Sequence, residues 1–348
     1  MILASALLST FLALSVSGAT QSSAPGPCAT PATALTADEV AAQFAEHQFV
    51  FIGATHGDAK IEEFLMCLVT RPTFQQRVTD IVVESAGSGH QKLIDRYVLL
   101  LEDIPPDALT PIWFDTDSPI LWARLPQVRK FAATLRDVNR TLPPAKRIRL
   151  VGGNDGVDWT KVRTAEDLAP YPYKTNFIPH LLIEHLAKAA GNKTLVVYGD
   201  AHIHYQGNNF MGELEFALGR SKLFVVGRIG ELAPEERAYL AAVGDPTTPF
   251  FVDSKRFPTN LPWPQSLKVA FEERSPQLSD YIDAFVYLGP ERDRNLAGSL
   301  PLTEAQQREL DRRSSIMSDH QRTMRARLQG REQWFRSHPN DFPARPQP

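Results

Sequence analysis

Short apolar runs alternate with longer amphipathic stretches along most of the chain from residue 49 onward. The runs are rich in β-branched and aromatic residues and show no polar alternation, which is typical of strands covered on both faces. This alternation predicts an α/β fold, with a mostly parallel sheet flanked by helices in three layers and a helical extension at the C-terminus. The expected strands are 49–53, 80–84, 148–152, 194–199 and 223–227, with weaker ones at 250–252 and 284–289, and the expected helices lie near 60–70, 90–102, 119–138, 178–190 and 209–219.

The N-terminal residues have the pattern of an export signal. Residues 1–19 form a short apolar run that ends in small residues, as before a cleavage site, and predict a signal peptide. No Lys or Arg precedes this run, so an uncleaved anchor stays an alternative. Residues 20–34 are rich in Ser, Ala, Pro and Thr, which is typical of a linker. Thr36 and Glu39 then have capping-box spacing, which predicts a helix to about His47.

The C-terminal pattern differs from the middle of the chain. No strand pattern returns after Pro290, and 303–337 is a polar, Arg-rich stretch with one thin apolar stripe at roughly heptad spacing. We expect a long solvated helix that packs on the core, with a dimer-forming or lid helix as the alternative. The chain thus divides into an α/β domain over 35–290 and a helical tail over 291–348. The residues of the stripe are Leu310, Met317, Met324 and Leu328.

Composition limits the partners. Apolar residues make up 43% of the chain, enough for a core, and the net charge of −3 offers no general attraction to nucleic acid. We expect a small-molecule or peptide substrate. Beyond the signal no apolar run is long enough to span a bilayer, so the mature chain is expected to be secreted or periplasmic, without stable membrane insertion.

Two cysteines, Cys28 and Cys67, are compatible with one disulfide or with two free thiols. The oligomeric state stays open.

Polar side chains follow the expected strands at the point where each strand ends. His56 follows the first strand; Glu84 ends the second and His90 comes after it. In an open parallel sheet these ends lie along one edge, where ligands bind. Each residue also has a plain explanation, as a hydrogen-bonded loop histidine, a solvated acid or a turn former. Their shared position nevertheless predicts one functional cluster. Asp155 follows the third strand, and His202 and His204 follow the fourth.

Such a cluster is suited to hydrolysis. Two histidines and a carboxylate can bind a divalent transition metal and leave a position open for water. Without a metal, a histidine can act as general base while a carboxylate orients it and another group stabilises the oxyanion. A serine nucleophile has less support because no G-x-S-x-G elbow occurs. The chain also has no phosphate-binding glycine motif and no H-E-x-x-H motif.

The strand ends resemble a known superfamily. "GATH" at 53–56, Glu84, and "GDAH" at 199–202 are similar to the paired G-x-x-H motifs with an intervening Glu. These motifs mark the erythromycin esterases, the TIKI/TraB proteins and the ChaN-like haem-uptake proteins. "ATHG" before an acidic helix start, and "DRYV" at 95–98, resemble the erythromycin-esterase branch most. The resemblance covers the strands and their ends from about 45 to 230.

The resemblance implies an α/β fold with its site at the strand ends. TIKI-type members are metal-dependent proteases, the esterases open a macrolide lactone by activating water, and the haem-uptake branch binds haem. Carried over position by position, His56, Glu84 and His202 match the motif, whereas His204, Asp155 and His90 rest on their position alone. The chain departs at Ala54, where esterase and haem-uptake members usually carry Glu, and this leaves the branch open.

We therefore expect an extracytoplasmic hydrolase of an ester, lactone or amide. His56 is the expected general base or metal ligand, Glu84 would orient it or share the metal, and His202 would be a second ligand or an electrophilic partner. Because Ala54 removes one acid, a metal-assisted mechanism with Mn, Co or Zn is favoured over histidine alone. A non-catalytic haem- or metal-binding protein and an inactive superfamily member are the alternatives. Arg96 and Arg228 are candidates to neutralise a substrate anion, or to form ion pairs within the protein.

Overall fold

The strands that the structure describes form one sheet of seven, in the order β3-β2-β4-β1-β5-β7-β6. Neighbouring strands pair in parallel, except that β6 runs antiparallel to β7. The predicted α/β fold with a mostly parallel sheet is confirmed, and every expected strand is found within a few residues of its predicted bounds. The strands are β1 (Phe49–Ala54), β2 (Asp80–Gly87), β3 (Arg149–Asn154), β4 (Thr194–Gly199), β5 (Leu223–Ile229), β6 (Phe250–Asp253) and β7 (Ala284–Tyr287).

The computed structural model describes residues 28–154, 156–171, 183, 185–205, 210–230, 237–257, 277–290 and 300–337. The expected signal peptide 1–19, part of the expected helix 178–190, and Asp155 lie outside these residues, as do the side chains of Met324 and Leu328. The described α-helices are α1 (Pro31–Ala42), α2 (Ala59–Thr70), α3 (Pro72–Gln75), α4 (Gln91–Ile94), α5 (Pro111–Phe114), α6 (Pro119–Trp122), α7 (Pro126–Thr141), α9 (Phe210–Leu218), α10 (Arg237–Ala241) and α12 (Glu304–Ser337).

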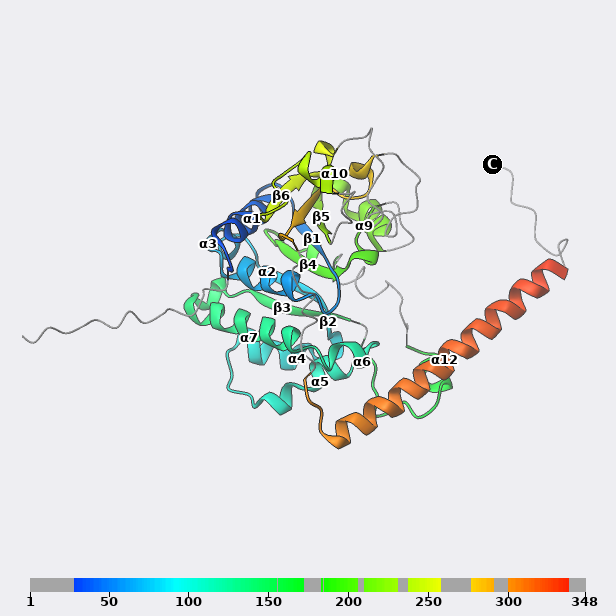
Figure 1. Ribbon diagram of the computed structural model, residues 1–348. Helices are drawn as coiled ribbons and strands as arrows, with labels where there is room; N and C mark the ends of the chain where they lie inside the picture. The colour runs from blue at the N-terminus through cyan, green and yellow to red at the C-terminus, as the bar shows by residue number, and fades with distance from the viewer. Residues whose placement is uncertain are drawn as a thin grey trace, which may run out of the picture.

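Helices cover both faces of the sheet (Figure 1). Successive residues of a strand point to opposite faces, so each strand of the centre contributes to two cores. Val50 and Ile52 of β1 lie in the core that α1, α2 and α7 cover. Phe49 and Phe51, the alternating residues, lie in the core that includes residues of α9 and α10. The apolar runs without polar alternation in the sequence therefore reflect strands buried on both sides.

Several helix boundaries differ from the sequence prediction. The first helix begins at Pro31 and not at Thr36, so the end of the expected linker 20–34 is helical. Thr30 caps this helix, because its Oγ1 accepts a hydrogen bond from Thr33 N at 3.1 Å, and Pro31 suits the first helical position. The expected helix 119–138 is broken before Pro126, since a residue that precedes proline is driven out of the helical region.

The expected helix 90–102 is also shorter than predicted. It consists of α4 and a π-helical turn over Asp95–Leu99. Asp95 in this turn forms an ion pair with Arg149 of β3 at 2.8 Å. The "DRYV" stretch thus joins the helix to the edge strand of the sheet.

The long C-terminal helix α12 is present over nearly the predicted range. Leu310 and Met317 of the apolar stripe are buried against the body of the protein. Arg313 between them donates to Phe114 O at 2.6 Å and pairs with Asp115 at 2.9 Å. The far end of α12 extends away from the sheet in Figure 1. The division at Pro290 stays a prediction.

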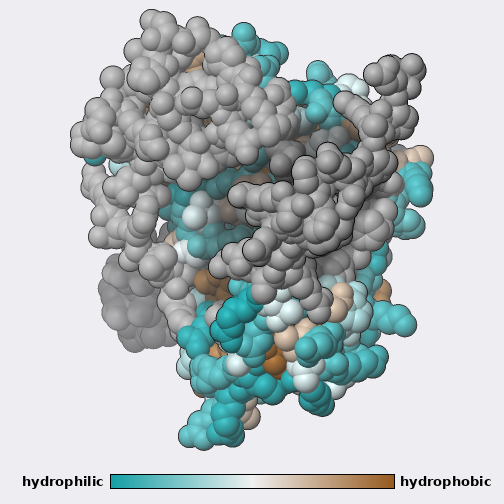
Figure 2. Space-filling view, turned by 90° about the vertical axis from the view of Figure 1, so that its right-hand side faces the viewer, coloured by the Kyte–Doolittle hydropathy of each residue, from teal (hydrophilic) through white to brown (hydrophobic). Residues whose placement is uncertain are grey.

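The surface of the described residues is largely hydrophilic on the face seen in Figure 2, with small apolar areas between polar ones. Among the described residues, no helix combines the length and the apolar character that a bilayer-spanning helix needs. A disulfide joins Cys28, in the N-terminal arm, to Cys67 of α2. Of the two possibilities left open by the sequence, the structure therefore selects the paired cysteines.

Candidate functional site

Three strands at the centre of the sheet carry the candidate site. β4 lies between β2 and β1, so the ends of these strands are neighbours. His56 follows β1 in the loop before α2, and His202 ends a 3-10 turn (Asp200–His202) that follows β4. Glu84 lies within β2. Parallel pairing thus brings together three residues that are far apart in the sequence.

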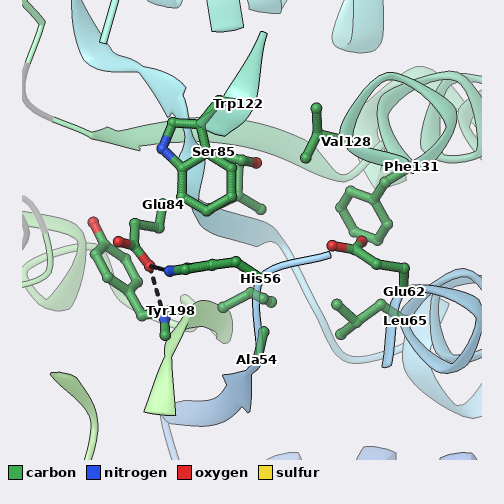
Figure 3. A pocket seen from close by; sticks show the side chains of 13 residues that line it. Ala54, His56, Glu62, Leu65, Glu84, Ser85, Trp122, Val128, Phe131 and Tyr198 are labelled. Carbon is green, nitrogen blue, oxygen red and sulfur yellow. Dashed lines mark hydrogen bonds and ion pairs between the residues drawn. The ribbon is translucent and has the colours of Figure 1, made fainter. Parts of the chain in front are cut away.

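Glu84 lies between the two histidines. Its Oε2 is 3.9 Å from His56 Nε2, and its Oε1 is 3.9 Å from His202 Nε2. Oε2 also accepts a hydrogen bond from Gly199 N at 2.7 Å, which fixes the carboxyl group (Figure 3). The separations from the histidines are longer than hydrogen bonds. The predicted cluster of His56, Glu84 and His202 is therefore assembled, with the carboxylate at its centre.

The first glycines of the two G-x-x-H motifs make this approach possible. A Cβ at Gly53 of β1 would overlap the carboxylate of Asp200, which belongs to the second motif. A Cβ at Gly199 of β4 would lie 3.2 Å from His56 Nε2, which belongs to the first motif. Each glycine thus leaves room for a polar side chain of the other motif, across the β1–β4 pairing.

We expect Gly53→Ala to lower the free energy of unfolding by about 1–3 kcal/mol, because the added methyl overlaps the buried carboxylate of Asp200. Gly212→Ala is the matched control, since a Cβ at this position of α9 meets nothing within 4 Å. Urea unfolding of both variants provides the measurement. A Gly53→Ala/Asp200→Ala double variant tests the cause. If its loss in the free energy of unfolding equals the sum of the two single losses, the overlap with Asp200 does not explain why a glycine is needed at position 53.

Burial dominates the electrostatics of the site. It lowers the pKa of His56; the charge of Glu84 opposes this effect, and His202 adds to it. Burial raises the pKa of Glu84, which His56 and the Gly199 N–H oppose. Burial also raises the pKa of Asp200 to about 6, against a hydrogen bond from Thr55. Burial thus favours the neutral form of His56, and its ring makes no hydrogen bond with the described residues.

A small pocket opens beside His56, with a cavity volume of about 30 Å³. One water needs about 10–15 Å³, so the space holds about two waters. In Figure 3, His56, Glu84 and Tyr198 lie on one side of the pocket, and Trp122 and Ser85 lie above it. The His56 and Trp122 rings meet edge to face, with centroids 4.6 Å apart. The remaining residues of the pocket are Ala54, Glu62, Leu65, Val83, Val128, Phe131, Val197 and Gly199.

His202 does not line this pocket, and neither do the other candidate histidines. His90 pairs with Asp115 through Nε2 at 3.0 Å, and Asp115 in turn pairs with Arg313 of α12. His204 lies two residues beyond His202, and its Nδ1 is 3.3 Å from Tyr205 O. Neither histidine lines the pocket. Asp155 lies outside the described residues, so its expected supporting role stays a prediction.

The two candidate arginines form ion pairs within the protein. Arg96 pairs with Glu102 at 2.7 Å, and both side chains are exposed. Arg228 of β5 is buried and pairs with Asp58, the residue that caps α2. Neither arginine lines the pocket.

One acidic residue of the pocket is not among the candidates at the strand ends. Glu62 lies in the first turn of α2, and its carboxyl group reaches the pocket opposite His56, beside Leu65 and Phe131 (Figure 3). Burial raises its pKa to about 7. The carboxyl group has no hydrogen-bond or ion-pair partner among the described residues. A signal was present in the sequence, because Glu62 lies three residues before Leu65 and thus on the buried stripe of the helix.

The described residues do not fit the expected metal site. His56 and His202 face different oxygens of Glu84, and the oxygen facing His56 already accepts a hydrogen bond from Gly199. No group of three His, Cys, Asp or Glu side chains in the described ranges is arranged to hold a metal ion. The three predicted ligands are therefore close to one another without forming a coordination set.

Comparisons with known proteins identify no family for the chain. No protein-family model matches the chain, and no curated protein matches it. A Bacillus cereus protein of solved structure is 13% identical, with a TM-score of 0.40 over 72% of this chain and 90% of its own. A succinoglycan biosynthesis protein is 12% identical, with a TM-score of 0.46 over 72% and 90%. ChaN of Campylobacter jejuni, a protein with cofacial haem binding, is 14% identical, with a TM-score of 0.36 over 56% and 86%.

Proposed function

We propose that this protein hydrolyses an ester, lactone or amide with water that His56 activates. The observation that carries the proposal is the position of His56, which lines a small pocket, has Glu84 at 3.9 Å and makes no hydrogen bond with the described residues. A general base must be neutral to accept a proton, and burial, which lowers the pKa of His56, favours this form.

Each residue of the cluster has a distinct role in this mechanism. His56 takes the proton from a water in the pocket as the water attacks the acyl carbon. The carboxylate of Glu84, held by Gly199 N–H, stabilises the imidazolium that forms. His202 lies on the other side of Glu84, outside the lining of the pocket, and its ring, 3.9 Å from Oε1, helps to orient that carboxylate. His56 then returns its proton to the leaving group.

The disulfide of the protein supports the proposal that the chain is exported. A disulfide between Cys28 and Cys67 persists in an oxidising compartment, which agrees with the signal peptide expected over 1–19. We therefore propose that the mature chain acts outside the cytoplasm on a small molecule or peptide.

The test is a panel of esters, lactones and amides offered to the wild-type chain and to Glu84→Gln. We expect wild type to hydrolyse at least one compound, and Glu84→Gln to lose about 10²-fold of that activity, because the imidazolium loses its counter-charge. Glu63→Gln, an exposed neighbour of the pocket helix, is the control.

Two further outcomes separate the alternatives. Activity that persists after treatment with a chelator excludes the metal-assisted mechanism, and loss that Mn²⁺, Co²⁺ or Zn²⁺ restores supports it. A Soret band in protein from haem-supplied cells, together with no hydrolysis of the panel, would replace the hydrolase by a haem-binding protein.

A further inference from the structure

Glu62 is the one carboxylate of the pocket that the proposed mechanism does not use. It faces His56 from the opposite wall, and its neighbours there are the hydrocarbon side chains of Leu65, Val128 and Phe131 (Figure 3). No donor among the described residues reaches its carboxyl oxygens. Burying a carboxylate without a partner is costly, so the charged form of Glu62 is stabilised only when something else supplies the partner.

Nearby cations of the chain do not supply it. Lys60, two residues before Glu62, donates its ammonium to Gly289 O at 3.1 Å and Pro290 O at 2.6 Å. Arg228 pairs with Asp58 at the start of the same helix. Among the described residues, the pocket is lined by two glutamates and by no Lys or Arg. Its electrostatic potential therefore favours a positive group from outside.

The walls and the size of the pocket restrict that group. The rings of Trp122 and Phe131 line the space, and aromatic rings attract cations. A metal ion is a poor match, since these walls offer hydrocarbon where a metal needs further ligands. The free space equals about two waters, which suits a primary ammonium better than the bulkier trimethylated one.

We propose that Glu62 binds a protonated primary amine of the substrate, so that the protein acts on acyl compounds with an amino group close to the scissile carbon. This inference rests on the proposed hydrolase function and names its substrate class. His56 and Glu62 face each other across one small pocket, so the amine and the reacting acyl group are separated by a short chain of atoms.

The first test measures binding without any reaction. Thermal unfolding of the full chain is followed in methylammonium chloride, in tetramethylammonium chloride and in sodium chloride at equal concentration. We expect methylammonium alone to raise the midpoint of the wild type, by about 2 °C near saturation, because it binds the folded state only. Glu62→Gln should lose the shift and Glu63→Gln should keep it. An equal shift in Glu62→Gln would overturn the proposal.

The second test uses a matched pair of substrates, the 4-nitrophenyl esters of β-alanine and of butyric acid. They differ in that an ammonium replaces a terminal methyl group. We expect the wild type to prefer the β-alanyl ester by about 10-fold in kcat/KM, the value of one charged hydrogen bond. Glu62→Gln should lose this preference, whereas Glu63→Gln, at an exposed position, should keep it.

The outcomes distinguish the two proposals. If Glu62→Gln lowers both rates equally, Glu62 acts on the reacting water and the amine site is wrong. If the wild type hydrolyses both esters equally and methylammonium has no effect, the amine site is wrong and the hydrolase stands. If neither ester reacts but methylammonium stabilises the wild type and not Glu62→Gln, the amine site stands and the hydrolase is wrong.

Discussion

Replacement of His56 by alanine is expected to lower kcat/KM by about 10²–10⁴-fold, the usual contribution of a general base. The fold should persist, because the side chain of His56 is about one-third exposed and makes no hydrogen bond with the described residues. Hydrolysis of a compound identified in the panel provides the measurement. Urea unfolding checks that stability is unchanged. Added imidazole should restore part of the activity, since the variant leaves a space where the ring was.

The pH dependence of the wild type gives a second measurement of the same role. Because burial lowers the pKa of His56, the acid limb of kcat/KM should lie below the ordinary value of 6.5. Glu84 opposes that effect, so Glu84→Gln should move the limb to still lower pH. His90→Ala is the control, because His90 pairs with Asp115 away from the pocket. A His56→Ala variant with wild-type activity and an unshifted limb would remove His56 from the mechanism.

The sheet could be predicted from the sequence because its strands are buried on both faces. Runs such as "FVFIG" and "TLVVYG" are short, apolar and rich in β-branched or aromatic residues, which favours strands covered on both faces. The order of the strands could not be predicted. β1 pairs with β4 and β5, which lie far along the chain, and the local pattern contains no information on such pairing.

Helix ends were harder to predict than strands because single residues decide them. Thr30 caps the first helix, although Thr36 has the better motif with Glu39. Thr36 is instead buried inside that helix, where its hydroxyl bonds to Ala32 O at 2.9 Å. Tertiary packing thus overrode a local capping signal.

Part of the site could be predicted because three of its residues follow or end strands that are recognisable in the sequence. His56, Glu84 and His202 lie at the ends of strands that could be recognised, so the rule for parallel sheets brings them together. His90 satisfies the same rule, yet it turns towards Asp115, which no strand pattern reveals. Glu62 could not be predicted from the strand ends, because it lies on a helix, where an acidic residue in the first turn needs no functional explanation. Only the packing of α2 against α7 places its carboxyl group in the pocket.

Removal of the disulfide is expected to have the largest effect on stability. Cys28 and Cys67 are 39 residues apart, and a loop of that length contributes about 4 kcal/mol by restricting the unfolded chain. Cys28→Ala is the suitable variant, because Cys67 is fully buried and a polar replacement there would disturb the core of α2. We expect its urea midpoint to fall well below that of the oxidised wild type.

Adding a reductant distinguishes the effect of losing the disulfide bond from the effect of replacing the Cys28 side chain. Reduced wild type should unfold at the same urea concentration as Cys28→Ala, and the reductant should not change the variant further. Helix α2 carries both Cys67 and, in its first turn, Glu62. Loss of the bond between α2 and the N-terminal arm should therefore also reduce the increase in the thermal midpoint that methylammonium causes. Equal stability of the oxidised wild type and Cys28→Ala would mean that the arm is already ordered without the bond, and that the disulfide restricts little of the unfolded chain.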